Sequence, residues 1–233
     1  TSLSAGSYTV TVSNSPTCDT ILSVVINQPE ELILIAVENQ SILCNGDSTG
    51  IALVTQVGGT PGYAYQWNDP DLQTTDQATG LPFGTFEVIV TDANNCTVTA
   101  SVEITEPASI SISVMVDNTT CNGGNEGSIT AMVSGGVGPY SYLWSDSLAQ
   151  TTETAIDLEA GSYDVQVTDA NGCIMTFVGV LVQEPTALNV TLDPVQNISC
   201  NGANDGSITA NVTGGTPGYT FVWDDPLLQT SVV

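Results

Sequence analysis

The 233-residue sequence contains no lysine, no arginine and no histidine, against 25 aspartate and glutamate residues, so its formal charge is −25. Nucleic acid is excluded as a partner because no cation is present to neutralise a phosphate group. An anionic lipid surface is disfavoured for the same reason. A serine or cysteine nucleophile would lack the histidine or lysine that usually serves as its base. A phosphoryl group would lack the lysine and arginine side chains that usually bind it during transfer. We therefore expect that the protein is not an enzyme.

Long apolar runs and metal-binding cysteine pairs are missing as well. The longest apolar run, Leu32–Val37, has the length of a strand and is far short of the roughly 18 residues that span a bilayer. No membrane insertion is expected in this segment. The sequence has no C-x-x-C pair, which argues against a zinc site. No signal peptide is seen, but Thr1 falls in the middle of a repeat, so the segment is expected to be internal to a longer chain.

What the sequence does contain is an internal repeat. One copy is defined by four motifs: Cys121-Asn122-Gly123, a Gly-Gly pair at 135–136, Trp144 and Asp169-Ala170-Asn171-Gly172-Cys173. The same pattern occurs upstream and begins again downstream, with equivalent cysteines 77 positions apart (Cys44 to Cys121) and then 79 apart (Cys121 to Cys200). A fixed period of this length is typical of a tandem array.

The period divides the chain into four parts. Residues 1–29 are the C-terminal part of a repeat, 30–107 and 108–185 are complete repeats of about 78 residues, and 186–233 are the N-terminal part of a further repeat. The predicted boundaries fall at Glu106-Pro107 and Glu184-Pro185, where proline cannot donate to a strand ladder and stiffens the link.

Each repeat has the signals of an all-β fold. Apolar and polar residues alternate along short segments, for example at Tyr8, Val10 and Val12, which is the period of a half-buried strand. Strands are predicted over 50–57 and 128–133, and a less regular, threonine-rich stretch over 73–79. About seven short strands, one tryptophan in the third and a tyrosine corner before the penultimate strand indicate a small immunoglobulin-like sandwich. The motif Gly161-x-Tyr163-x-Val165-x-Val167-Thr168-Asp169-Ala170-Asn171-Gly172 also resembles that of PKD-type domains. No apolar stripe of helical period is present.

Six cysteines in register with the repeat suggest disulfides and an oxidising compartment. We expect the first strand to end, and the last hairpin to turn, at the same end of the sandwich. This predicts the within-repeat pairs Cys44–Cys96 and Cys121–Cys173, each stabilising by about 4 kcal/mol. The rival pair Cys96–Cys121 would have to span roughly 30 Å, one strand length, whereas a bridge needs Cα atoms within about 7 Å.

Three further kinds of site have to be weighed. Acidic and amide side chains in the turns are candidate calcium ligands, although the same residue types serve turn geometry: Asp47, Asp92, Asn94, Glu126, Asp169, Asn171 and Asp205. The tryptophan strand is a candidate glycan platform, but Trp144 is expected in the core, packed on the disulfide. Glycosylation sequons of the N-x-[ST] type and acceptor sites of the Asp-Ser/Thr-apolar type are the third kind, at Asn95, Asn118, Asn189, Asn197, Asn211, Asp19-Thr20 and Asp146-Ser147.

These motifs together resemble the SprB repeat of Bacteroidota surface proteins. The resemblance covers essentially the whole chain. It is closest in two stretches, Gly80-Leu81-Pro82-Phe83-Gly84-Thr85-Phe86 and Val102-Glu103-Ile104-Thr105-Glu106-Pro107. Members of that family are very long secreted adhesins, including those of gliding motility, so the resemblance implies a cell-surface filamentous protein exported by the type IX system. The complete lack of basic residues departs from an ordinary family member.

We therefore expect a structural extracellular protein, in which tandem β-sandwiches form a stiff cell-surface stalk or filament and each disulfide locks the segment that it encloses. Its partners would be neighbouring repeats of the same or of identical chains. The alternative is an adhesin whose acidic loops bind glycans or external surfaces, with calcium as a candidate ligand. Residues 186–233 of one chain could also be completed by residues 1–29 of another, as in strand-complemented fibres.

Overall fold

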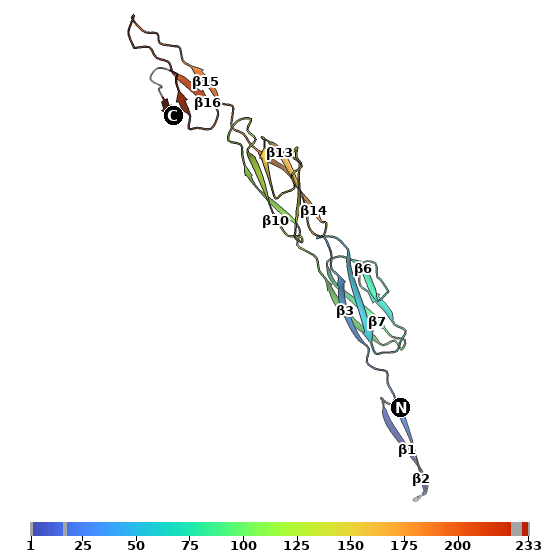
Figure 1. Cartoon of the computed structure of the whole chain (residues 1–233). Helices are drawn as coiled ribbons and strands as arrows, with labels where there is room; N and C mark the ends of the chain where they lie inside the picture. Colours follow the sequence, from blue (N-terminus) through green and yellow to red (C-terminus); the bar gives the residue numbers. More distant parts are fainter. Residues whose placement is uncertain (1, 16–17, 225–229, 233) are drawn as a thin grey trace. The chain divides into compact units, whose positions relative to one another are not determined.

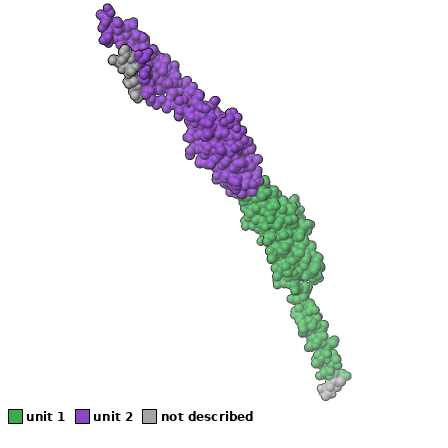
Figure 2. Space-filling model, in the orientation of Figure 1, with its two compact units in different colours: residues 1–107 green, residues 108–233 purple. Residues whose placement is uncertain are grey.

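The computed structural model describes residues 2–15, 18–224 and 230–232, which form two compact units, residues 1–107 and residues 108–233 (Figure 2). Each unit contains one of the two stretches predicted to be complete repeats, together with a flanking segment. Within the described ranges every regular element is a strand. None of these residues forms a helix that is long and apolar enough to cross a membrane.

The repeat 30–107, here the first repeat, folds into two antiparallel three-stranded sheets. One sheet has the order β3-β4-β6 and the other the order β5-β7-β8. Strands β3, β6 and β7 are labelled in Figure 1. The bounds of its strands are β3 Ile33–Gln40, β4 Gly50–Val57, β5 Ala64–Trp67, β6 Gln77–Leu81, β7 Gly84–Thr91 and β8 Thr97–Ile104.

The repeat 108–185, here the second repeat, has the same topology. Its sheets have the orders β9-β10-β12 and β11-β13-β14, again with antiparallel neighbours. The bounds are β9 Ser111–Asp117, β10 Gly127–Ser134, β11 Ser141–Trp144, β12 Thr154–Leu158, β13 Gly161–Thr168 and β14 Ile174–Val182.

This strand order is that of an immunoglobulin sandwich with one edge strand missing. The immunoglobulin fold pairs strands A, B, E and D in one sheet and C, F and G in the other. The first repeat has the A-B-E and C-F-G sets, which confirms the predicted immunoglobulin-like fold with six strands instead of about seven. The threonine-rich stretch that the sequence predicted to be irregular supplies β6 and, in the second repeat, β12.

The core lies between the two sheets of each repeat and is built from alternate positions of their strands. Val88 and Val90 of β7, Ile104 of β8 and Trp67 of β5 are all buried in the first repeat. The residues between them face outward, as the period of two requires. The second repeat buries Trp144 with an equivalent set.

The predicted tyrosine corner is present wherever the sequence has a tyrosine. The Tyr163 hydroxyl donates to the Glu159 carbonyl (2.9 Å), and the Tyr8 hydroxyl donates to the Ser4 carbonyl (2.8 Å). The first repeat has Phe86 at this position, which is buried but carries no hydroxyl.

Each unit also contains strands outside its complete repeat. In residues 1–29, β1 (Gly6–Ser15) and β2 (Cys18–Ile26) form a two-stranded hairpin. After residue 185, β15 (Asn189–Leu192) pairs with β16 (Ala210–Thr213), and β17 (Thr220–Val222) pairs with β18 (Thr230–Val232). The two units divide after Pro107, and the four-part division predicted from the sequence stays a prediction.

Candidate functional site at the ends of the repeats

The Cys-Asn-Gly turn of the first repeat holds the chain where it leaves the sandwich, here called the distal end. The Asn45 side-chain amide donates to the Pro107 carbonyl (3.0 Å). The Gly46 N–H donates to the Glu106 carboxylate (2.7 Å). We call these four residues the distal clamp, because they fix both residues of the Glu-Pro boundary to the turn after β3.

The second repeat builds the same clamp from equivalent residues. The Asn122 side-chain amide donates to the Pro185 carbonyl (3.2 Å), and the Gly123 N–H donates to the Glu184 carboxylate (2.6 Å). The Cys-Asn-Gly motif thus has a use that the sequence analysis did not assign to it. Its asparagine and glycine supply the two donors that bind the departing chain.

An acidic side chain holds the shape of this turn from within. In the second repeat the Glu126 carboxylate accepts hydrogen bonds from the Thr120 N–H and hydroxyl and from the Cys121 N–H. The Thr120 hydroxyl and N–H are the main reasons why the pKa of Glu126 falls to about 2. In the following segment Asp205 accepts from the Ser199 N–H (3.0 Å), and hydrogen bonds from Ser199 lower its pKa as well. Both carboxylates therefore act as anchors of the turn.

The Gly-Gly turn holds the chain where it enters the repeat, here called the proximal end. The second glycine donates its N–H to a carbonyl of the incoming chain, and we call this contact the proximal clamp. The first glycine allows the close approach, because a Cβ on Gly135 would lie 2.0 Å from the Ser109 carbonyl oxygen. The clamp is formed by Gly59 with Glu30 (2.9 Å), Gly136 with Ala108 (2.7 Å) and Gly215 with Thr186 (2.7 Å).

A buried aspartate ties the proximal end to the last hairpin. In the first repeat the Asp92 carboxylate accepts hydrogen bonds from the N–H groups of Thr60 (2.9 Å), Asn94 (2.9 Å) and Cys96 (2.8 Å). The Thr60 bond leads the contributions that lower the pKa of Asp92. The Asp-Ala-Asn turn is thereby fastened to the residue that follows the Gly-Gly pair.

Asp169 does the same in the second repeat. Its carboxylate accepts from the N–H groups of Val137, Asn171 and Cys173, each at 2.9 Å. Burial acts to raise the pKa of Asp169, but these bonds outweigh burial and the pKa lies below its ordinary value. Three backbone donors account for the position of this side chain, so turn geometry explains it without calcium.

The other candidate calcium ligands do not gather into a site. Within the described ranges, no group of three or more histidine, cysteine, aspartate or glutamate side chains is placed to hold a metal ion. Asn94 uses its side-chain amide to donate to the Thr60 hydroxyl (2.7 Å). In place of an acidic anchor, the turn that contains Asp47 has Thr49, whose hydroxyl accepts from the Leu43 N–H (3.4 Å).

The predicted disulfide pairs are not those of the structure. Cys44 and Cys173 are each disulfide-bonded, whereas Cys96 and Cys121 are exposed free thiols, as is Cys200. The predicted pairs Cys44–Cys96 and Cys121–Cys173 are therefore wrong.

The physical reason is the direction of the first and last strands. β3 and β8 both run from the proximal to the distal end. Just before β3, Leu32 lies beside Gly59 and Asp92 at the proximal end. Just after β3, the Ile42 N–H donates a hydrogen bond to the carbonyl of Thr105, the residue that follows β8 at the distal end. The first strand thus ends at the distal end, while the hairpin between β7 and β8 turns at the proximal end. An eight-residue strand separates the two ends by roughly 26 Å, whereas a disulfide needs Cα atoms within about 7 Å.

The tryptophans of the complete repeats belong to the core, as predicted. Trp67 and Trp144 are buried, and their indole N–H groups donate to the carbonyls of Thr75 and Thr152, both at 2.9 Å. Neither ring is available as a glycan platform. The expected packing of Trp144 on the Cys121–Cys173 disulfide is wrong, because Cys121 is an exposed free thiol.

The sequence analysis did not single out Asp69, two residues after Trp67, and named the equivalent Asp146 only as part of an acceptor site. Asp69 is buried and accepts from the Asp71 N–H and from the Gln73 N–H and side-chain amide. Asp146 makes the same bonds to Leu148 and Gln150. Burial acts to raise the pKa of both aspartates, yet the bonds lower it. The recurring Trp-x-Asp-x-x-x-Gln spacing was the available signal.

Comparison with known proteins identifies the repeat. The family model of the SprB repeat matches residues 37–72, 113–149 and 192–228. Each match begins within or beside the first strand of a repeat and extends past its tryptophan. No curated protein matches the sequence.

Two solved structures that match this chain do so at low similarity. The crystal structure of murine CEACAM1b is 13% identical, with a TM-score of 0.30 over 65% of this chain and 100% of that chain. The crystal structure of a tetra-tandem repeat in the extending region of a large adhesion protein is also 13% identical, with a TM-score of 0.28 over 86% of this chain and 61% of that chain. Similarity at this level carries no argument about function. The evidence for a function is therefore taken from the contacts at the ends of the repeats.

Proposed function

This chain belongs to the SprB-repeat family, and on that premise we propose that it is a structural extracellular protein whose tandem β-sandwich repeats form a stiff cell-surface stalk or filament. Export by the type IX system is part of the same proposal. Its support is the family, whose repeats are found in cell-surface proteins. The physical support is the way in which each repeat holds the chain at both of its ends.

One observation carries the proposal: two consecutive carbonyls in the connection after the second repeat are held by hydrogen bonds from either side. The Pro185 carbonyl is bound by Asn122 of the second repeat (3.2 Å), and the next carbonyl, that of Thr186, is bound by Gly215 of the following segment (2.7 Å). Proline at 185 also fixes its own φ. A connection clamped on consecutive residues has little conformational freedom.

A direct contact across this connection supports the same conclusion. The Thr216 hydroxyl, in the residue after the Gly-Gly pair, donates to the Thr120 carbonyl (3.2 Å), which precedes the Cys-Asn-Gly turn. The distal turn of one repeat and the proximal turn of the following segment therefore bind each other as well as the linker. Thr120 is the residue that Glu126 anchors, so the turn anchor and this contact share a residue.

The strand directions suit a load-bearing element. In the first repeat the chain enters at the start of β3 and leaves at the end of β8, and these two strands lie against each other while running in the same direction. Tension applied through the ends would shear β3 past β8 rather than peel a hairpin open. Resistance to force then rests on the sandwich core, in place of the within-repeat disulfides expected from the sequence.

The acidic composition suits an exposed extracellular filament. With 25 carboxylates and no cationic side chain, copies of the chain repel one another, which favours solubility. The alternative, adhesion through acidic loops and calcium, has less support. The carboxylates of Asp92, Asp169 and Glu126 are already engaged by N–H groups of their own turns.

Small-angle X-ray scattering of the chain with Asn122→Ala tests the stalk. Loss of the amide that binds the Pro185 carbonyl should loosen the connection, so the radius of gyration and the maximum dimension should both fall. The fold should persist, since one exposed hydrogen bond contributes about 1 kcal/mol, which corresponds to a shift of roughly 4–8 °C in the thermal midpoint of a domain of this size. Asn125→Ala, in the same exposed turn, is the matched control and should leave the scattering unchanged. Identical scattering profiles for both variants and the parent would contradict the proposal.

A further inference from the structure

One sheet edge in the first repeat is covered by a side chain in the place where a strand would lie. β6 is the last strand of its sheet and has β4 on one side only. In an immunoglobulin sandwich the next position belongs to strand D, which pairs with strand E. An open edge presents unpaired N–H and C=O groups, to which a strand of another chain can bind. The partners of these groups therefore decide whether the edge of β6 is open.

Gln73 occupies the place of the missing strand. Its side-chain carboxamide accepts a hydrogen bond from the Thr79 N–H (3.0 Å) and donates one to the Thr79 carbonyl (2.9 Å). A residue of a neighbouring antiparallel strand would make the same two bonds. The Thr75 hydroxyl donates to the carbonyl of Gln77, two residues away on the same strand. The outward-facing backbone groups in the middle of β6 are thus engaged.

The second repeat covers the edge of β12 in the same way. The Gln150 carboxamide accepts from the Ile156 N–H (3.0 Å) and donates to the Ile156 carbonyl (2.9 Å). The Thr152 hydroxyl donates to the Thr154 carbonyl (2.6 Å). The covered residue is a threonine in one repeat and an isoleucine in the other, so the carboxamide binds the backbone of the edge and does not select a side chain.

An aspartate holds each carboxamide in this position. The side-chain nitrogen of glutamine has two hydrogens to donate. In the first repeat one of them goes to the Asp69 carboxylate (2.9 Å) and the other to the Thr79 carbonyl. In the second repeat Asp146 accepts from Gln150 (3.1 Å). Both donors of each carboxamide are used, and its orientation towards the edge is thereby fixed.

The backbone of the same glutamine binds the edge of the other sheet. β5 is also the last strand of its sheet, and the N–H of Trp67 at its end donates to the Gln73 carbonyl (3.0 Å). The Trp144 N–H donates to the Gln150 carbonyl (2.9 Å). One residue thus binds edge groups of both sheets on the same side of the sandwich.

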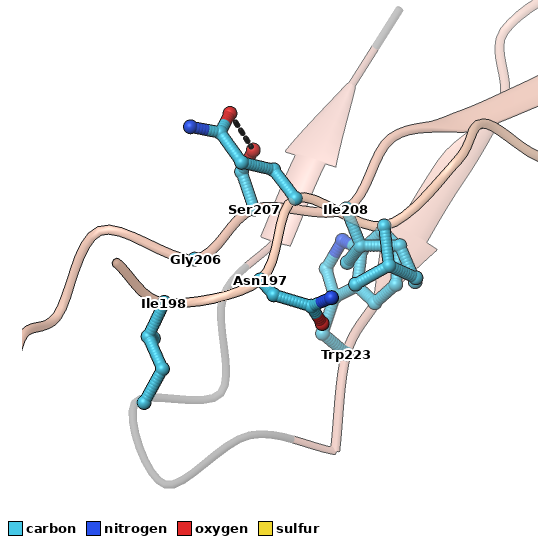
Figure 3. A pocket seen from close by; sticks show the side chains of 8 residues that line it. Asn197, Ile198, Gly206, Ser207, Ile208 and Trp223 are labelled. Carbon is cyan, nitrogen blue, oxygen red and sulfur yellow. Dashed lines mark hydrogen bonds between the residues drawn. The ribbon is translucent and has the colours of Figure 1, made fainter. Parts of the chain in front are cut away.

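The same spacing occurs a third time in the sequence, as Trp223, Asp225 and Gln229. Trp223 lines a pocket of about 580 Å³ together with Asn197 and Ile208 (Figure 3). Asp225 and Gln229 lie outside the described residues. The covered edge is therefore described in the first and second repeats.

From these contacts we propose that Gln73 and Gln150 are edge covers, which keep the sheets β3-β4-β6 and β9-β10-β12 from pairing side by side with the same sheets of another copy of this chain. Their carboxamides take the hydrogen-bonding positions that an added strand would use. The inference goes beyond the stalk proposed above and does not depend on the stiffness of its connections.

Charge repulsion alone would not protect these edges. Paired strands lie about 4.8 Å apart, whereas at physiological salt the repulsion between exposed charges is largely screened beyond about 8 Å. Only the carboxylates nearest to the edge would then oppose a second copy. Because the edge recurs from the first repeat to the second, open edges would also allow several weak pairings to act together. A cover in each repeat prevents the first of these pairings.

Analytical ultracentrifugation of the whole chain with Gln73→Ala and Gln150→Ala tests the proposal. The free thiols Cys96, Cys121 and Cys200 should first be blocked with iodoacetamide, so that disulfides between copies cannot add mass. In 0.15 M salt we expect the double alanine variant to associate at least tenfold more tightly than the parent chain. Association equal to that of the parent chain would overturn the proposal.

Gln73→Glu combined with Gln150→Glu is the matched control. Glutamate has the same length and keeps a charged side chain over the edge, but when ionised it cannot donate to the Thr79 and Ile156 carbonyls or to the neighbouring aspartates. This variant should lose stability and yet associate no more tightly than the parent chain. Equal association of the alanine and glutamate variants would mean that association follows from lost stability, which would overturn the proposal.

Amide hydrogen exchange measures the cover directly. In the parent chain the Thr79 and Ile156 N–H groups should exchange at least tenfold more slowly than in the alanine variant at low protein concentration. At concentrations where the alanine variant associates, its Ile156 N–H should be protected again, because an added strand replaces the carboxamide. Gln150→Ala alone, which leaves the first repeat intact, replaces the double variant if that variant unfolds. An associated variant whose Ile156 N–H stays unprotected would refute the edge cover.

Discussion

Replacement of Trp144 by alanine is expected to destabilise the second repeat by about 3–5 kcal/mol, the usual cost of truncating a buried tryptophan. The ring is only 2% exposed and belongs to the same core cluster as Val165 and Val167. The change would leave a cavity between the two sheets. It would also remove the indole N–H that donates to the Thr152 carbonyl.

Differential scanning calorimetry of the whole chain measures this effect. The transition of the second repeat should move down by more than about 12 °C, given roughly 4–8 °C per kcal/mol for a domain of this size. Leu143→Ala is the matched control on the same strand, because Leu143 is 47% exposed and its truncation should cost about 1 kcal/mol or less. Equal shifts for the two variants would show that Trp144 is not a core residue.

Replacement of Gly135 by alanine is expected to be among the most damaging changes in a turn. Gly135 has a φ of +74°, a backbone conformation that residues with a side chain rarely adopt. The added Cβ would also lie 2.0 Å from the Ser109 carbonyl oxygen. The incoming chain would have to move away from the Gly-Gly turn, and the proximal clamp between Gly136 and Ala108 would open. We expect a loss of at least about 3 kcal/mol, since strain and a broken contact add.

Gly172→Ala separates the two causes of this loss. Gly172 also has a positive φ, +84°, but nothing lies within 4 Å of the position that a Cβ would take there. The first repeat has Asn95 at the equivalent place, with φ +65°. The control should therefore cost only the backbone strain, about 1–2 kcal/mol. Chemical unfolding of both variants measures the difference, and a Gly135→Ala variant no less stable than Gly172→Ala would refute the close approach.

Much of the fold could be predicted because the repeat places the same residue types at the same turns. The strand predicted over 50–57 coincides with β4, and the alternation along it gives the buried face. The tryptophan core was predictable for the same reason. The strand β6 was not, because its sequence, Gln77–Leu81, is rich in residues that do not favour strands, and only pairing with β4 makes it one.

The cysteine prediction failed on topology rather than on chemistry. The first and last strands of this sandwich run in the same direction, so Cys44 lies at the distal end and Cys96 at the proximal end. Regular spacing of cysteines shows that they recur, but it does not show which end of a domain each one occupies. That information comes from the order of the strands in the sheets.

The functional use of the turns could be predicted only in part. Asp92 and Asp169 were expected to serve either turn geometry or calcium, and the N–H groups that surround them favour turn geometry. The clamps were not foreseen, because Asn45 and Pro107 are 62 positions apart and no local pattern connects them. Such a contact is visible only after the first and last strands have been placed side by side.

Backbone dynamics across residues 184–187 test the central claim most directly, namely that each repeat holds the chain at both ends. The measurement is ¹⁵N relaxation of the Glu184, Thr186 and Ala187 amides, with strand β10 as the rigid reference. The clamps predict order parameters of about 0.85 at these residues, equal to those of β10. Values below about 0.6 would mean a flexible linker, and they would contradict both the clamps and the stiff stalk built on them.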